Sequence, residues 1–161
     1  FVDSAKLTSA AMALSGLCFL LMSHWHEDSL NTLSATVVLA ACGLGFGLAI
    51  APVNAALLAH TAAEVHGLAS GLLVVARMVG MLIGISALTT IGLRAFHHAT
   101  SKIAPVKEIC GSTQSCAAYA TALQDAGVSQ LQAVFAGAAI AAFIAATLAF
   151  WLLRDTANVT S

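Results

Sequence analysis

Long uninterrupted apolar runs constrain this chain more than any other feature. They lie at about residues 6–24, 36–58, 66–95 and 129–153. A helix needs about 20 apolar residues to cross a bilayer core of about 30 Å, and the last three runs meet that length. The first run reaches it only together with its flanking residues. The sequence therefore predicts an all-α, polytopic membrane protein with four transmembrane helices.

The low charge content excludes several other classes of protein. Only 8% of the 161 residues are charged, against about a quarter in soluble domains, so too few charges exist to cover a soluble surface. Four segments without strict polar–apolar alternation cannot close a membrane barrel. The formal net charge of −1 provides no basic surface for nucleic acid. No nucleophile–base set or phosphate loop is visible in the sequence, so nothing indicates an enzyme, and we expect no cofactor.

A polar region separates the last two apolar runs, at about residues 96–128. The helical pattern of the third run continues to about Lys102, and Pro105 then stops it. We expect an extended helical hairpin here, with a simple surface loop as the alternative. Cys110 and Cys116 lie near its tip and would form a disulfide in an oxidising compartment, with two free thiols as the alternative. No Cys/His quartet has the spacing of a zinc site, so we expect no metal.

Arg77 is the only charge in the interior of the third run, because Arg94 lies at its end. If that helix begins near His66, Arg77 lies about 16 Å along it, close to the bilayer midplane. An arginine at that depth costs at least about 2.5 kcal/mol and stays protonated. The acids of the chain lie in loops or at helix ends. We expect Arg77 to meet an acid from outside this chain, a substrate or water, with snorkelling to the membrane surface as the alternative.

Two stripes of small and polar residues are candidates for a cavity lining, because the members of each stripe share a helix face. The candidates are Asn54, Gly43 and Gly47 in the second run, and Ser70 and Gly84 beside Arg77 in the third. A packed helix whose Asn54 bonds a neighbour is the alternative. Gly67, Gly71 and Gly80 belong to small-residue pairs spaced four apart, so we expect them to allow close helix packing.

Residues 43–96 resemble a known protein family. The glycine-rich "GLGFGLAIAPVN", the short link and "HGLASGLLVVARMVGMLIG" resemble the C-terminal part of a major facilitator superfamily transporter. The likeness is to the fourteen-helix drug:proton antiporter branch, and within it to the actinobacterial, lipoprotein-associated exporters implicated in triacylglycerol export and multidrug efflux. The opening "FVDSAKL" resembles a degraded copy of the Asp-x-x-Gly-x-Arg loop motif of that family.

The resemblance implies that residues 1–161 are the C-terminal portion of a transporter's helical bundle in the bacterial inner membrane. It implies proton-coupled export of hydrophobic compounds, lipids or drugs, by alternating access and without a cofactor. Arg77 would form an ion pair with an acid of the missing N-terminal bundle. A periplasmic lipoprotein is an implied partner, and the hairpin at 96–128 would face outward. The alternative is a four-helix membrane module that assembles or anchors other proteins and transports nothing.

Overall fold

A computed structural model describes residues 4–26, 33–59, 61–111 and 116–159, with side-chain detail within residues 6–152 of these segments. All regular secondary structure in the described segments is helical. Ala and Leu dominate the sequence of these helices, and both favour the helical state. The predicted all-α fold is confirmed.

Four long helices and two short ones make up the described chain. In order they are α1 (Ser4–Met22), α2 (Leu33–Ala59), the 3-10 turn η2 (Ala63–Val65), α3 (His66–Thr100), α4 (Val106–Cys110) and α5 (Ala117–Val159). The helices α2, α3 and α5 are long and apolar enough to cross a membrane, whereas α1 is shorter. The sequence predicted four spans, and the described helices support three of them by length. The helix α1 has 19 residues, of which Lys6–Met22 form an apolar segment, so a fourth span at α1 stays a prediction.

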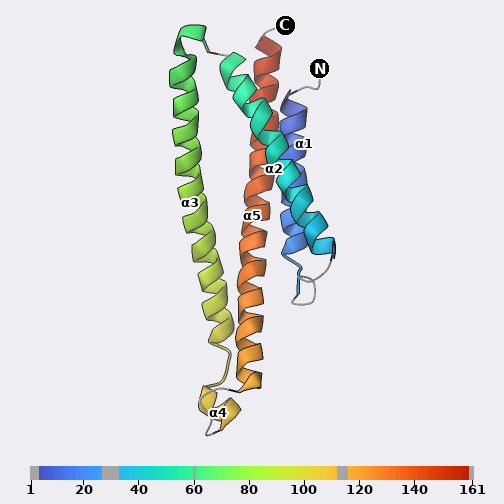
Figure 1. Cartoon of the computed structure of the whole chain (residues 1–161), viewed down its shortest axis with the longest axis vertical. Helices are drawn as coiled ribbons and strands as arrows, with labels where there is room; N and C mark the ends of the chain where they lie inside the picture. Colours follow the sequence, from blue (N-terminus) through green and yellow to red (C-terminus); the bar gives the residue numbers. More distant parts are fainter. Residues whose placement is uncertain (1–3, 27–32, 60, 112–115, 160–161) are drawn as a thin grey trace.

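The long helices lie roughly along one axis (Figure 1). The helix α1 packs along both α5 and α2, and α3 packs against α5. The start of α1, the end of α5 and the η2 link lie at one end of the molecule, and α4 lies at the other (Figure 1). Toward α4, α3 and α5 extend beyond α1 and α2 (Figure 1). The membrane side that this end of the molecule faces stays a prediction.

A close backbone approach holds α1 against α2. Gly45 is buried, and a Cβ at this position would lie 2.8 Å from the Ala11 carbonyl oxygen and would collide with Ser15 Oγ. The Ser15 hydroxyl is fully buried and donates to the Ala11 carbonyl at 3.2 Å. Beside this crossing, Cys18 and Cys42 are buried free thiols, and buried cysteines of this kind behave as small apolar packing residues. Only a residue without a side chain fits at position 45.

Residues 130–137 of α5 contact the chain after α1 on one side and α3 on the other. The Gln132 side chain donates from Nε2 to the Trp25 carbonyl at 2.8 Å, which ties α5 to the chain just after α1. On the other side, Gly92 of α3 is buried, and a Cβ there would lie 2.7 Å from Val134 Cγ2. Gly137 faces Leu88 in the same contact. These contacts join α3 to α5 in the C-terminal third of α3.

The rest of α3 is uncovered within the described chain. Residues 67–91 are all exposed or half-buried, although this stretch is almost entirely apolar. Isolated apolar side chains on a surface are ordinary, but a helical segment of this length without a buried residue indicates contact with lipid or with further protein. This part of α3 also carries Arg77.

Candidate functional site

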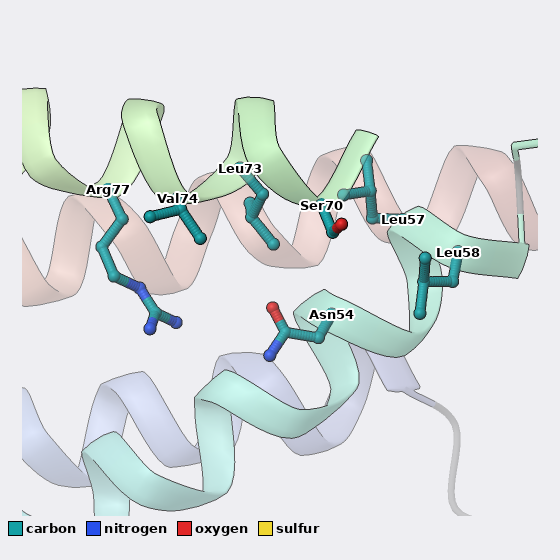
Figure 2. A pocket seen from close by; sticks show the side chains of 7 residues that line it. All are labelled: Asn54, Leu57, Leu58, Ser70, Leu73, Val74 and Arg77. Atoms are coloured by element: carbon teal, nitrogen blue, oxygen red, sulfur yellow. The ribbon is translucent and has the colours of Figure 1, made fainter. Parts of the chain in front are cut away.

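A pocket of about 300 Å³ lies between α2 and α3, on the side of the link that joins them. Its lining residues are Asn54, Leu57 and Leu58 from α2 and Ser70, Leu73, Val74 and Arg77 from α3 (Figure 2). The lining is mostly aliphatic. Its volume lies at the lower end of the range for small-molecule sites, about 300–1,000 Å³.

Helical periodicity explains why these residues share the pocket. Residues 70, 73, 74 and 77 recur at the i, i+3, i+4 and i+7 positions, which lie on one face of α3. Residues 54, 57 and 58 repeat the first three of these positions on α2. The two faces meet next to η2, because a link of only a few residues keeps the end of α2 close to the start of α3.

The polar atoms of the pocket come from opposite sides. The guanidinium of Arg77 and the carboxamide of Asn54 both extend into the space between α2 and α3 (Figure 2). Within the described part of the chain, neither side chain has a hydrogen bond or an ion pair. The Ser70 hydroxyl, by contrast, donates to the Gly67 carbonyl at 3.0 Å and stays within its own helix. Two strong hydrogen-bonding groups therefore face one apolar pocket and are open to a ligand or a partner.

The structure brings two of the predicted cavity residues, Asn54 and Ser70, together with Arg77. The predicted cavity residues Gly43, Gly47 and Gly84 do not line this pocket. A Cβ at Gly43 or Gly47 would meet nothing within 4 Å. It stays a prediction that these glycines line a cavity formed together with helices outside this chain.

The predicted packing glycines make no close contact inside the described chain. A Cβ at Gly67, Gly71 or Gly80 would meet nothing within 4 Å. Their packing role stays a prediction that concerns helices outside this chain. The glycines that do pack closely are Gly16, Gly45, Gly92 and Gly137. Sequence reasoning missed these four, because spacing alone does not tell which face of a helix meets its neighbour.

Cys110 and Cys116 are joined by a disulfide, with their Cα atoms 5.6 Å apart. Gly111 follows Cys110 with φ of 65°, a left-handed conformation that glycine adopts without strain. The bond closes the tip of the hairpin between α4 and α5. The alternative of two free thiols is not what the structure shows.

Comparisons with known proteins point to one group of relatives. No family model matches the chain. The chain is 38% identical over 144 residues to a triacylglyceride transporter of Mycolicibacterium smegmatis, a match that covers 81% of this chain and 26% of the relative. It is 40% identical over 98 residues to a triacylglyceride transporter of Mycobacterium tuberculosis strain H37Rv, covering 55% of this chain and 19% of that protein. A probable triacylglyceride transporter of Mycobacterium leprae is 39% identical over 103 residues, covering 56% and 20%.

The chain thus spans about a quarter or less of the length of the curated relatives that it matches. All three relatives carry the name of a transporter, and none carries the name of an enzyme. The similarity extends over most of this chain in the first of them, and so includes the helices that form the pocket.

Proposed function

We propose that this chain is the C-terminal part of a major facilitator superfamily transporter of the fourteen-helix branch. The transporter would export hydrophobic compounds across the bacterial inner membrane in exchange for protons. The names of the relatives support a lipid such as triacylglyceride as cargo, and drugs are the second cargo class. Three helices long and apolar enough to cross a membrane support the location. One observation carries the proposal: the guanidinium of Arg77 faces a pocket without an acid partner in the described chain.

Arg77 would couple proton entry to the movement of the two bundles. A guanidinium does not lose its proton, so Arg77 cannot itself carry the proton that drives transport. An acid of the N-terminal bundle would pair with Arg77 in one state of the transporter. Protonation of this acid would remove its charge, weaken the contact and favour the other state. The uncovered surface of α3 around Arg77 leaves room for such a partner.

Replacing Arg77 with Ala in the full-length protein tests this role. We expect Arg77→Ala to lower export driven by a pH gradient by at least about tenfold, because removal of one partner leaves the other charge buried without a counter-charge, at a cost of about 3–5 kcal/mol. Export is measured in proteoliposomes with equal amounts of inserted protein. Arg94→Ala is the matched control, since Arg94 is an exposed cation on the same helix outside the pocket. Normal gradient-driven export by Arg77→Ala would rule out the coupling role.

A membrane module that assembles or anchors other proteins is the second candidate function. The uncovered apolar stretch at residues 67–91 of α3 favours it, because such a surface accepts a partner helix. The reading frame around this chain discriminates between the two. Further apolar segments of a whole transporter encoded upstream support export, whereas a start of translation near Phe1 supports the module.

A further inference from the structure

The polar end of the α2–α3 pocket, defined by Arg77 and Asn54, suits an anionic head group. Guanidinium N–H groups form a planar fork that matches the two oxygens of a carboxylate or phosphate, and a carboxamide supplies a further N–H donor. Both side chains point into the same space (Figure 2) and lack a partner within the described chain. Charge complementarity therefore selects an anion over a cation or a neutral polar group.

The remainder of the lining, which we call the apolar wall, consists of Leu57, Leu58, Leu73 and Val74. An inorganic anion at the polar end would leave this wall unfilled. A neutral hydrocarbon would fill the wall but leave the guanidinium without a counter-charge in an apolar setting, which is costly. Arg77 and Ser70 are seven residues apart, or about 10 Å along α3. The pocket is therefore long enough for an anionic head group at one end and part of a hydrocarbon chain beyond it.

We propose that this pocket binds a single-chain amphiphile with a carboxylate or phosphate head. The head would lie on the polar end, and the chain would lie against the apolar wall. The inference rests on the proposed function in one respect: the acid of the N-terminal bundle must separate from Arg77 when that acid is protonated. The amphiphile and that acid then compete for the same guanidinium, so the ligand occupies the pocket in the state where the bundle contact is broken.

Binding of simple amphiphiles to the full-length protein tests the inference. The protein is placed in nanodiscs of zwitterionic lipid without a pH gradient, and equilibrium binding is measured for dodecanoate, dodecyl phosphate, dodecanol and acetate. At least one of the two anionic amphiphiles should bind about tenfold or more tightly than dodecanol, which lacks the charge, and than acetate, which lacks the chain. The comparison between carboxylate and phosphate identifies the head group. Equal binding of dodecanol and both anions would overturn the inference.

Variants locate the binding at this pocket. Arg77→Gln should weaken binding of the anionic amphiphile by at least about tenfold, and Asn54→Ala by a smaller factor of about two to five. Arg94→Gln, an equal change of charge elsewhere on α3, should bind like the unaltered protein. Unchanged binding by Arg77→Gln would place the ligand elsewhere and overturn the inference. Should Arg77→Gln fail to fold, the preference of the unaltered protein together with the Asn54→Ala variant decides the outcome.

The two proposals can fail separately. The binding measurement uses no gradient, so loss of proton coupling does not affect it. Normal export by Arg77→Ala would contradict the coupling role alone. A wild-type protein that does not prefer an anionic amphiphile would contradict the ligand assignment alone.

Discussion

Gly45 allows α1 and α2 to approach closely, and a single methyl group at this position should separate them. We expect Gly45→Ala to lower the free energy of unfolding by about 1–3 kcal/mol, the usual cost of overpacking. The reason is that the new Cβ would meet the Ala11 backbone carbonyl, which cannot rotate away as a side chain can. Reversible denaturation in mixed detergent micelles measures the change.

Gly43→Ala and Gly47→Ala are the matched controls for Gly45→Ala. They lie two residues to either side in the same helix, and a Cβ at either would meet nothing within 4 Å. Both controls should leave stability unchanged or raise it by up to about 1 kcal/mol, because alanine favours helix more than glycine does. A Gly45→Ala protein as stable as these controls would contradict the close crossing.

Sequence alone predicted the polar residues of the pocket but not the glycines that pack. Arg77, Asn54 and Ser70 could be identified because a charge or a carboxamide is conspicuous in an apolar run, and helical spacing places it on a face. Gly45 and Gly92 could not be identified, because the rotation of one helix against another depends on side chains from distant parts of the chain. The aliphatic lining of the pocket gave no signal, since leucines lie on every face of these helices.

The disulfide at the hairpin tip joins α4 to the start of α5. A closed loop of about six residues stabilises the structure it spans by about 2 kcal/mol in the chain-entropy account. We expect the double variant Cys110→Ser, Cys116→Ser to raise amide hydrogen exchange in α4 by about 30-fold, the equivalent of that energy. Residues 80–90 of α3 serve as the internal control and should not change. Equal exchange in α4 with and without the bond would show that the tip is held by other contacts.

The sequence predicted the end of α3 more closely than the start of α5. The end of α3 at Thr100 lies close to the expected stop before Pro105, because proline ends a helix by a local steric effect. The start of α5 at Ala117 lies well before the expected span at about residue 129. Membrane length predicts only the apolar part of α5, whereas its polar start lies in the region where the sequence predicted a helical hairpin, at residues 96–128.

The hairpin formed by the ends of α3 and α5 is the most prominent feature of the whole molecule, since it extends beyond α1 and α2 (Figure 1). If it guides a very apolar lipid away from the membrane, shortening residues 97–127 while keeping the spans should lower lipid export. Export of a small drug-like cargo should change much less, because such a cargo leaves into water unaided. Transport of both cargoes in proteoliposomes measures the difference.

A variant that replaces the same residues with a flexible Gly/Ser segment of equal length is the control for the hairpin test. It keeps the length of the connection and removes its rigid helical form. Lipid export that stays unchanged in both variants would exclude a role of the hairpin in transport.

The contact of α3 with α5 around Gly92 has a mechanical consequence. That contact extends from Leu88 to Gly92, so Arg77 lies 11 residues from its near edge, or about 16 Å along a stretch with no buried residue. If α3 tilts about its contact with α5, the Arg77 guanidinium therefore moves much further than Gly92 does. A tilt of about 10° would move that charge by about 3 Å, enough to make or break a salt bridge while the α3–α5 contact barely moves.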